Sequence, residues 1–417
     1  MKALVIGSGA RESALVWALS RSSTVSHLYA GPGNAGTAEV AGNLASLDPL
    51  DPDAVLAACR THEIDLAVIG PEAPLAAGVV DRLNAAGVAA LGASRAASRL
   101  ESSKSFAKEF MARHGVPTAR SQHVHEVGTA ERLLRSSERP LVVKRDGLAD
   151  GKGVLDSEDV DALVEFARDG LRSGSVLLEE HLSGPELSAF VLLPGGGRGD
   201  YLLFPYCADY KKQHEGEVGL NTGGMGSITP VPWITEELDR RIRARIIEPT
   251  VRGMAEECLS YRGVLYVGLM VTDDGPKVIE YNVRFGDPEA QALIPSLDTD
   301  LASLLEAVAA GRLPDAPTQD RAAVCVVVAS GGYPERYETG FPVDLPVAAP
   351  DRGLIFHAST RTRDGGVVTG GGRCFSAVGL GQDLAGAAAH AYEVAERIRF
   401  EGAWYRRDIA RAFRGNR

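Results

Sequence analysis

The stretch Lys277-Val-Ile-Glu-Tyr-Asn-Val-Arg-Phe-Gly-Asp-Pro-Glu289 is the most informative part of this chain. Its apolar residues 278–281 predict a strand that carries Glu280 and, two positions further on, Asn282. Side chains alternate between the two faces of a strand, so both oxygen donors project to one side, and Arg284 joins them if the chain stays extended. A carboxylate, an amide oxygen and a guanidinium on one face suit Mg2+ bridging polyphosphate oxygens. The alternative is a surface strand edge with an incidental Glu–Arg pair.

Composition is typical of a soluble globular protein. The 417 residues suffice for about three domains of ~150 residues, and neither the 45% hydrophobic nor the 24% charged content is unusual. The net charge of -11 argues against a nucleic-acid-binding surface. The five cysteines are far apart without CxxC spacing, which disfavours a zinc site or a disulfide framework and favours buried thiols in a reducing compartment.

Neither a targeting segment nor a membrane span is apparent. Met1-Lys2 leads directly into an expected strand, without the apolar core of a signal peptide. No apolar run approaches the ~20 residues that cross a bilayer. We therefore expect a cytoplasmic protein that binds small molecules, with no membrane or nucleic-acid partner, as a monomer or small homo-oligomer.

The order of predicted elements divides the chain into three domains. Strands (3–6, 25–29, 66–69, 88–91) alternate with helices (13–20, 53–60, 79–86), which predicts an N-terminal parallel α/β, Rossmann-like domain over residues 1–100. The region 101–320 mixes both kinds of element and includes a small subdomain at about 120–188. Its predicted elements are helices at 103–114, 160–171 and 236–257, strands at 141–144 and 176–180, and a hairpin of 263–272 and 277–281. Residues 321–417 are rich in strands and glycine, with a helix near 383–400, and predict a C-terminal β-rich domain.

The first loop, Gly7-x-Gly9, lies between an expected strand and an expected helix. Free N–H groups at a helix start favour a bound anion, so a phosphorylated small molecule is a reasonable ligand, and a tight turn without a ligand is the alternative. A dinucleotide is disfavoured, because Glu12 stands where a third glycine is expected. The second strand also ends in Ala30-Gly-Pro-Gly-Asn34, without a ribose-binding acid.

A second glycine loop follows Lys144 and contains Lys152. Glycines allow backbone N–H groups to approach phosphate oxygens closely. Lys144 would supply a fixed charge and Lys152 a mobile one to the phosphates of a nucleotide. The spacing differs from the Walker motif, so this is not a P-loop protein. An exposed hairpin turn is the alternative.

Two further segments give signals that are weak individually. Residues 176–180 run from apolar positions into Glu179 and Glu180; such a strand can face an adenine edge, and Glu186 is a good candidate to receive ribose hydroxyls. The loop Asn221-Thr-Gly-Gly-Met-Gly226 offers closely spaced backbone donors to a carboxylate or acyl-phosphate oxygen. A solvated strand end and a structural glycine turn are the alternatives.

Together these segments resemble the ATP-grasp superfamily, and within it the glycinamide ribonucleotide synthetases (phosphoribosylamine–glycine ligases) of purine biosynthesis. The similarity is colinear over essentially the whole chain, and the strings at 221–226 and 284–289 are its most specific parts. The motifs that carry it are Pro32-Gly-Asn-Ala-Gly-Thr37, Gly70-Pro-Glu72, Ser103-Lys-Ser-Phe-Ala-Lys108, Asp146-Gly-Leu148 with Gly151-Lys-Gly153, Asn221 to Gly226, Arg284-Phe-Gly-Asp-Pro-Glu289, Gly331-Gly-Tyr-Pro334, Phe356-His-Ala358 and Gly370-Gly-Gly-Arg373.

The resemblance implies ATP-dependent ligation of glycine to 5-phosphoribosylamine through a glycyl phosphate, with Mg2+ or Mn2+. No covalent nucleophile is needed, so catalysis would consist mainly of positioning and charge neutralisation. The resemblance implies Glu280 and Asn282 as metal ligands, and Arg284, Lys144 and Lys152 as catalytic residues. The implied nucleotide-binding residues are Lys104, Lys144, Gly151, Gly153, Glu179, Glu180 and Glu186. The implied substrate-binding residues are Gly7, Gly9, Asn34, Gly36, Thr37, Glu72, Asp209, Lys211, Asn221, Thr222, Gly223, Gly224, Met225, Asp287, Pro288 and Glu289.

Several positions depart from the family pattern near the expected substrate site, whereas the presumed ATP and metal residues are intact. Ser13 replaces the usual histidine, and Lys212 replaces an arginine and so loses bidentate anion recognition. This distribution leaves open a paralogous ligase with a different amine or amino acid, for example in specialised metabolism. A non-catalytic ATP-binding regulatory protein is a second alternative. The departing positions are Ala10, Ser13, Arg145, Asp150, Ala208, Tyr210 and Lys212.

Overall fold

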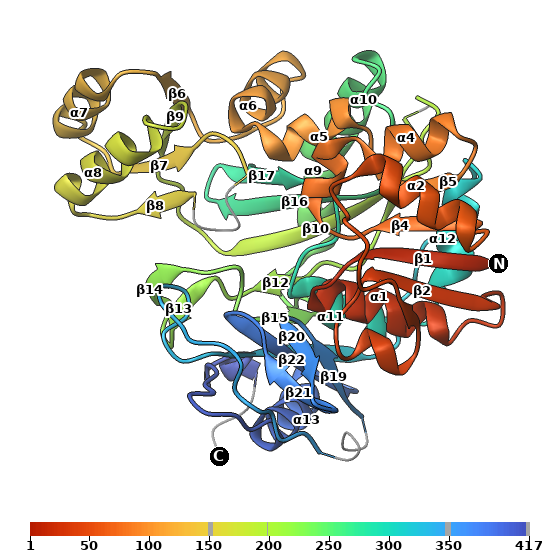
Figure 1. Ribbon diagram of the computed structural model, residues 1–417. Helices are drawn as coiled ribbons and strands as arrows, with labels where there is room; N and C mark the ends of the chain where they lie inside the picture. Colours follow the sequence, from red (N-terminus) through yellow and green to blue (C-terminus); the bar gives the residue numbers. More distant parts are fainter. Residues whose placement is uncertain (149–152, 198, 347–351, 414–417) are drawn as a thin grey trace.

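The computed structural model describes residues 1–148, 153–197, 199–346 and 352–413 (Figure 1). Its N-terminal part is the predicted parallel sheet. Strand β1 (Lys2–Gly7) lies between β2 (His27–Pro32) and β4 (Leu66–Ile69), and β4 pairs in parallel with β5 (Ala89–Ala93). Strand β2 begins two residues later than predicted, because the Val25 N–H closes a turn. The other elements are α1 (Ala10–Ser20), η1 (Thr37–Glu39), β3 (Gly42–Asn43), α2 (Pro52–Thr61), α3 (Glu72–Ala77) and α4 (Val79–Ala85).

A four-stranded sheet at the upper left of Figure 1 forms a small subdomain. Its strands lie in the order β6 (Ser121–Val124), β9 (Val176–Glu180), β7 (Leu141–Arg145) and β8 (Val154–Asp156), each antiparallel to its neighbour. Helices α7 (Val127–Ser136) and α8 (Val160–Gly170) pack beside it. Apolar side chains from these strands and helices form a core separate from the other cores of the chain, with Val124, Leu134, Val143, Leu163 and Val176 buried in it.

The predicted hairpin is present. Strands β16 (Tyr261–Thr272) and β17 (Gly275–Asn282) pair antiparallel, with Thr272 opposite Gly275 across a two-residue turn. The register shifts where Val278 faces Leu269 and Glu280 faces Gly268, so the intervening Ile279 is an extra residue that forms a β-bulge. The bulge lies directly before Glu280, the residue that the sequence marks for chemistry. Strand β16 also pairs with β10 (Glu186–Leu193), which pairs with β11 (Leu202–Leu203).

The single helix predicted at 236–257 has a break in its hydrogen-bonding pattern. Helix α9 (Glu236–Ile242) continues through a wider π-helical turn (Arg243–Ile247) into α10 (Glu248–Glu256). Pro249 lies in the first turn of α10 and lacks the N–H that an unbroken α-helix would require there. The other helices of this region are α5 (Arg95–Ser102), α6 (Lys104–Arg113), α11 (Glu289–Ser296) and α12 (Leu301–Ala309).

The two largest sheets cross the predicted domain boundaries. Tyr261 and Arg262 of β16 pair with Ala93 and Gly92 of β5, so the hairpin and the N-terminal strands form one nine-stranded sheet. Strand β15 (Gly226–Thr229) pairs with β18 (Ala322–Ala329), so the sheet of the C-terminal domain also contains a strand from the predicted 101–320 region. That five-stranded sheet has the order β12 (Ala208–Asp209), β15, β18, β22 (Arg373–Gly381) and β19 (Gly353–His357). The remaining elements are β13 (Lys212–His214), β14 (Val218–Asn221), β20 (Thr360–Arg363), β21 (Gly366–Thr369), α13 (Leu384–Arg397) and η3 (Arg411–Phe413).

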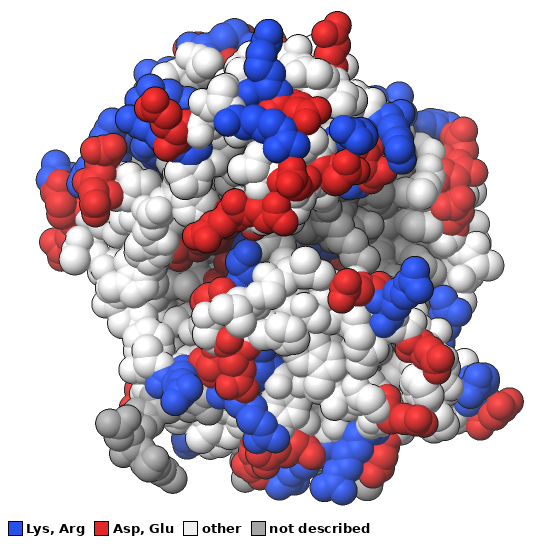
Figure 2. Space-filling model, turned by 90° about the vertical axis from the view of Figure 1, so that its left-hand side faces the viewer, with Lys and Arg blue, Asp and Glu red and all other residues white. Residues whose placement is uncertain are grey.

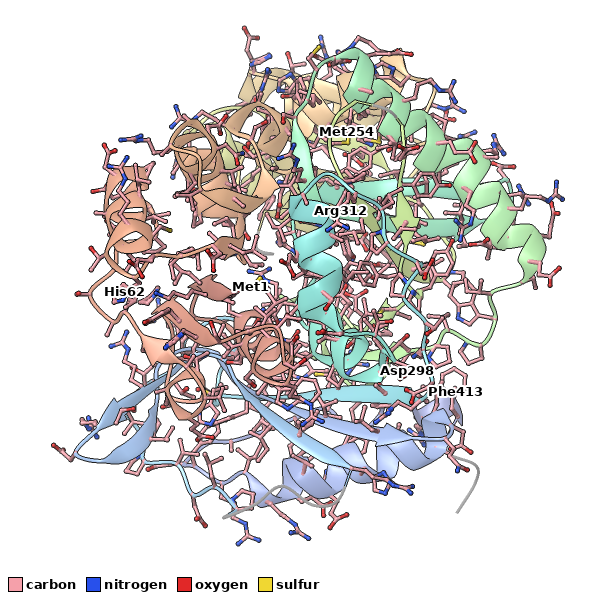
Figure 3. All side chains as sticks on the ribbon, turned by 90° about the vertical axis from the view of Figure 1, so that its right-hand side faces the viewer. Met1, His62, Met254, Asp298, Arg312 and Phe413 are labelled. Carbon is pink, nitrogen blue, oxygen red and sulfur yellow. The ribbon has the colours of Figure 1, made fainter. Side chains whose placement is uncertain are left out.

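The face shown in Figure 3 carries α12 between the labelled residues Asp298 and Arg312. Across the described ranges, no helix has both the length and the apolarity needed to cross a membrane. Four cysteines are buried, as predicted, but Cys258 is exposed. Cys258 follows α10 and has a φ of 54°, at the point where the chain turns back toward β16.

Candidate active site

A cavity of about 270 Å³ opens between the small subdomain, the β16–β17 hairpin and the C-terminal sheet. Figure 2 shows the hollow across this face, with acidic side chains gathered along its upper edge and positive side chains inside it. One stretch of wall is apolar and suits the faces of a nucleobase; the rest is densely charged. The apolar and aromatic side chains are Leu100, Ala107, Met111, Leu148, Val154, Tyr266, Ile279 and Tyr281, and the charged ones are Arg11, Glu72, Glu101, Lys104, Lys108, Lys144, Glu179, Asp209, Lys211, Glu280, Arg284, Asp287, Glu289 and Arg373.

The three residues of the opening motif meet in this cavity. Asn282 Nδ2 donates to Glu280 Oε1 at 3.2 Å, and Arg284 Nη2 donates to Asn282 Oδ1 at 3.1 Å. The predicted same-side arrangement is therefore confirmed, although β17 ends at Asn282 and does not extend to Arg284.

The surroundings of Glu280 and Asn282 fit a hard cation. Burial alone would raise the pKa of Glu280, but the charges of Lys211 and Lys144 outweigh it and the pKa is lowered, so the group is a carboxylate at neutral pH. The bonds to Glu280 and Arg284 fix which way the Asn282 amide faces, and its oxygen keeps a second lone pair. The described ranges contain no group of three or more His, Cys, Asp or Glu side chains arranged for a metal ion. Glu280 and Asn282 are therefore the two residues that would supply oxygen ligands to such an ion.

Two lysines share one carboxylate in the wall of the cavity. Glu179 Oε2 lies 2.9 Å from Lys144 Nζ and 3.1 Å from Lys108 Nζ, and the carboxylate is almost fully buried. Lys144 also donates to the carbonyl of Ile279, the bulge residue, at 3.2 Å. Burial lowers the pKa of Lys108 to about 8, against the opposing charge of Glu179. The second oxygen, Glu179 Oε1, is buried without a partner among the described residues, so it remains free to accept from a ligand.

Lys104 begins α6 and is held by the loop that follows β7. Its backbone N–H donates to Asp146 Oδ1 at 2.7 Å, and its Nζ donates to the carbonyl of Gly147 at 2.9 Å. Burial lowers the pKa of Lys104. Gly153 lines the cavity, whereas the predicted residues Gly151 and Lys152 lie outside the described ranges.

Lys211 lies among acids on the opposite side of the cavity. Its Nζ contacts Glu186 Oε2 at 2.7 Å and Asp209 Oδ2 at 4.0 Å, and these charges raise the pKa of Lys211 although burial opposes them. Burial raises the pKa of Asp209 well above its usual range, and burial likewise raises that of Glu289, which accepts from Ser188 Oγ at 3.0 Å.

Asp287 is contacted from all three parts of the chain. Its Oδ1 lies 3.1 Å from Arg373 Nη1 of β22 and accepts from Gln291 Nε2 of α11 at 2.9 Å; its Oδ2 accepts from the Arg11 N–H of α1 at 3.4 Å. Burial would raise the pKa of Asp287, but Arg373 and Arg11 lower it. Arg373 Nη1 also donates to the carbonyl of Gly223 at 2.6 Å and so ties the 221–226 loop to this junction.

Three family models for phosphoribosylglycinamide synthetase match successive stretches of the sequence. The N-domain model matches residues 1–101, the ATP-grasp (A) domain model 102–290, and the C-domain model 323–412. The chain belongs to the phosphoribosylglycinamide synthetase family. The predicted family and ligase class are therefore confirmed.

Relatives of the family support this over the full length. A phosphoribosylamine–glycine ligase of Chlorobaculum tepidum is 43% identical over 423 residues, which cover 98% of this chain and 99% of the relative. The crystal structure of a phosphoribosylamine–glycine ligase from Thermotoga maritima is 34% identical, with a TM-score of 0.86 over 98% of this chain and 100% of that one. A biotin carboxylase from Campylobacter jejuni, 16% identical with a TM-score of 0.73 over 99% and 94% of the two chains, shares the fold. The ATP-grasp domain model and the Thermotoga maritima structure confirm the predicted multidomain ATP-grasp fold.

Within this synthetase fold, the first glycine loop is occupied by a side chain of the protein. The Gly9 N–H donates to Glu12 Oε2 at 2.6 Å, so the group that the sequence offers to a phosphate is already paired. A Cβ at Gly7 or Gly70 would lie 2.6 Å or less from atoms of the same Glu12 side chain, which explains why both positions are glycine. The loop is therefore a packed turn around Glu12.

Other predicted substrate residues lie behind the cavity wall of the synthetase. Asn34 is buried, accepts from the N–H groups of Gly36 and Thr37 at 2.9 and 3.0 Å, and donates to the His357 carbonyl at 2.9 Å. Met225 is fully buried in a small apolar cluster. The predicted residues that line the cavity are Glu72, Lys104, Lys144, Gly153, Glu179, Asp209, Lys211, Thr222, Gly223, Glu280, Asn282, Arg284, Asp287 and Glu289. Those outside its lining are Gly7, Gly9, Asn34, Gly36, Thr37, Glu180, Glu186, Asn221, Gly224, Met225 and Pro288.

The structure adds four charged residues to the predicted site of this synthetase: Arg11, Glu101, Lys108 and Arg373. Arg11, Lys108 and Arg373 stand within or beside quoted motifs, so their positions carried a usable signal. Glu101 lies in the last turn of α5, just before the Ser103-to-Lys108 motif, and nothing in its spacing distinguishes it.

The departures from the family pattern mostly point away from the cavity. Ser13 Oγ is buried and donates to the His357 carbonyl at 2.7 Å, joining α1 to the C-terminal sheet. The Arg145 guanidinium lies 4.1 Å from the ring centre of Phe166 in the small subdomain and pairs with Asp169 at 2.8 Å. Tyr210 Oη accepts from the backbone N–H of Ala410 at 3.1 Å. None of the described departures, which are Ala10, Ser13, Arg145, Ala208, Tyr210 and Lys212, lines the cavity. Asp150 lies outside the described ranges.

Proposed function

We propose that this chain joins the carboxylate of glycine to the amine of 5-phosphoribosylamine at the expense of ATP, giving glycinamide ribonucleotide, ADP and phosphate. The observation that carries the proposal is the composition of the cavity wall. It combines the Glu280–Asn282–Arg284 set with the lysines around Glu179, while the described departures from the family pattern point elsewhere.

In the first step, an oxygen of the glycine carboxylate attacks the γ-phosphorus of ATP, the bond to the bridging oxygen breaks, and ADP leaves. Lys104 and Lys144 would neutralise the nucleotide phosphates, and Lys152, by its place in the sequence, would reach them from the glycine loop. The unpaired Glu179 Oε1 is suited to accept from the exocyclic amine of adenine. The predicted roles of Gly151, Gly153, Glu180 and Glu186 on the nucleotide remain part of this proposal.

Glu280 and Asn282 would hold Mg2+ or Mn2+, since a carboxylate and an amide oxygen are ligands that these hard cations accept. The charge of the nucleotide phosphates would be offset by an ion held by these two residues.

In the second step, the amine nitrogen attacks the acyl carbon of glycyl phosphate, a proton leaves the nitrogen, and inorganic phosphate departs. Arg284 would stabilise charge on the acyl phosphate. The N–H groups of residues 222–225 are already paired within the protein, so the 221–226 loop would contribute through the shape of the wall. Asp287 is the carboxylate best placed to face the amine, since it lies where the three parts of the chain meet. The other predicted substrate residues would act through the shape of the wall.

A paralogous ligase with another amine or amino acid is the second candidate. It is disfavoured because Ser13, Arg145 and Tyr210 make contacts within the protein and not in the cavity. A regulatory ATP-binding protein is disfavoured because the metal and phosphate groups converge as a reaction would require.

Purine biosynthesis and the absence of a spanning helix from the described ranges support a cytoplasmic location.

The test is ADP release by the purified chain with ATP, Mg2+, glycine and freshly generated 5-phosphoribosylamine, with glycinamide ribonucleotide measured in parallel. We expect release that requires both co-substrates and equals product in amount. Product formation from another amine or amino acid, with none from this pair, would favour the paralogue. ADP release that no amino acid and amine stimulate would contradict the ligase assignment.

A further inference from the structure

The guanidinium of Arg284 is surrounded by acceptors on nearly all its edges. Nε donates to Glu72 Oε2 at 3.2 Å, Nη1 donates to the carbonyl of Phe285 at 3.3 Å, and Nη2 donates to Asn282 Oδ1 at 3.1 Å. Nη2 also lies 2.8 Å from Glu101 Oε1, the shortest of its contacts. A guanidinium has five N–H donors, and Glu101 is an ion-pair partner of Nη2 and not a hydrogen-bond acceptor, so within the described ranges one N–H on Nη1 and one on Nη2 have no acceptor. Arg284 therefore keeps two N–H groups, one on each terminal nitrogen, for a substrate.

Glu101 does more than pair with this charge. Its second oxygen, Oε2, accepts from the backbone N–H of Val283 at 2.7 Å. Val283 is the first residue after β17, and it separates Asn282 from Arg284 along the chain. One carboxylate thus holds both the guanidinium and the backbone that carries it. This explains how Arg284 stays on the side of Asn282 after the strand, and with it the regular alternation of side chains, has ended.

The position of Glu101 is unfavourable without these partners. Its side chain is only 7% exposed, and it lies in the last turn of α5, where carbonyl groups make the local potential negative. Its other neighbour, Glu72, is also an acid. Ionisable groups that are buried and lie next to a group of like charge are typical of functional sites. Because Arg284 and the Val283 N–H engage both carboxylate oxygens of Glu101, we expect it to act on these two groups.

We infer that Glu101 is a positioning residue for the ligase reaction: its carboxylate holds both the Arg284 guanidinium and the Val283 peptide, so that the unpaired guanidinium N–H groups face the acyl phosphate. The inference rests on the proposed function, since it takes the role of Arg284 from it.

The test compares Glu101→Gln with Glu109→Gln, an exposed acid on the neighbouring helix α6 whose partner Arg113 lies 3.9 Å away. Glutamine keeps the size of the side chain but presents an amide to Arg284 in place of one carboxylate oxygen. A misplacement of about 1 Å costs on the order of 10²-fold in rate, so we expect kcat of Glu101→Gln to fall about 10²-fold while the KM for ATP stays within about twofold. Glu109→Gln should match the wild type.

A partly unfolded variant would also lose kcat, so ATP-binding stoichiometry is measured for each protein and should remain one per chain. If Glu101→Gln binds less ATP, Glu101→Asp provides the second variant: it keeps the charge, shortens the reach by one CH2, and should lose kcat per binding site. Wild-type kcat per binding site in both variants would overturn the inference.

A double-mutant cycle shows whether Glu101 acts through Arg284. If it does, the Glu101→Gln/Arg284→Lys protein should have a kcat within about twofold of Arg284→Lys alone. Losses that multiply would overturn the inference, as two independent roles would then be shown. A wild-type chain without glycine-dependent ADP release would instead contradict the proposed function, so the two failures are distinguishable.

Discussion

Glu179→Gln should destabilise the unliganded protein more than removal of either lysine that contacts this glutamate. Lys144 Nζ and Lys108 Nζ lie 2.9 and 3.1 Å from the same oxygen, so the two ammonium groups are no more than about 6 Å apart. With the carboxylate neutralised, their repulsion amounts to about 3 kcal/mol at an effective dielectric constant near 20. Removing one partner of a buried ionic group has a cost of about 3–5 kcal/mol, which agrees with this figure.

Lys144→Met leaves Glu179 paired with Lys108, so its cost should be lower, about 1.5 kcal/mol for one charged hydrogen bond. Lys108→Met should lower the free energy of unfolding by a similar amount, because Glu179 then stays paired with Lys144. The assay is urea unfolding without nucleotide, so a lost ATP contact has no influence. Glu165→Gln, an exposed acid on α8 paired with Arg168 at 3.1 Å, is the control and should change the free energy of unfolding by less than about 1 kcal/mol.

The pH dependence of this variant gives a second check. Burial already lowers the pKa of Lys108 to about 8, and loss of Glu179 should lower it further. A lysine with a lowered folded pKa costs stability as pH falls, because the unfolded chain then binds the proton more tightly. The loss in free energy of unfolding caused by Glu179→Gln, relative to the wild type, should therefore become smaller between pH 7 and pH 9. If Glu179→Gln loses no more free energy of unfolding at pH 7 than Lys144→Met does, repulsion between Lys108 and Lys144 is refuted as the cause.

Three other predictions concern the site and its supports. Glu280→Gln should abolish ADP formation while the circular dichroism spectrum and urea midpoint stay close to wild type; retained activity would remove its proposed metal role. Ser13→His should lower the free energy of unfolding by about 2–4 kcal/mol, through a lost hydrogen bond and overpacking at a buried site. It should leave the KM for the amine unchanged, and an altered amine preference would show that position 13 reaches the substrate. Burial lowers the pKa of His357 to about 4, so stability should be lost as pH falls from about 6.5 to 4, by about 3 kcal/mol in total. His357→Gln should flatten that loss in urea titrations at pH 7 and pH 4.5, whereas an equal loss in both proteins would contradict it.

Local pattern predicted the parts of the site that depend on one element. The hairpin and the shared face of Glu280 and Asn282 follow from alternation along a strand, and both are present. Glycine and lysine in loops likewise marked Lys144 and the 221–226 loop. These features need only the neighbouring residues in sequence to be recognised.

Features that depend on distant contacts were not predictable in this way. Glu101 meets Arg284 only because α5 packs against β17, and its own surroundings in the sequence are unremarkable in pattern. The same limit affected the departures from the family pattern. Arg145 directly follows Lys144 in strand β7. Neighbouring strand residues point to opposite faces, so the Arg145 side chain packs on Phe166 in the small subdomain. Sequence proximity to a site residue did not predict proximity to the cavity.

The two shared sheets have a consequence for how this protein can be divided. A cut after residue 101 or before residue 323, where the family models meet or end, would separate strands that belong to one sheet: β5 from β16 in the first case and β15 from β18 in the second. Each fragment would expose an unpaired strand edge, which promotes aggregation. The four-stranded sheet of the small subdomain is complete within residues 121–180 and has its own core. It is therefore the segment to express alone, to delete or to exchange between relatives, although the family models draw no boundary there.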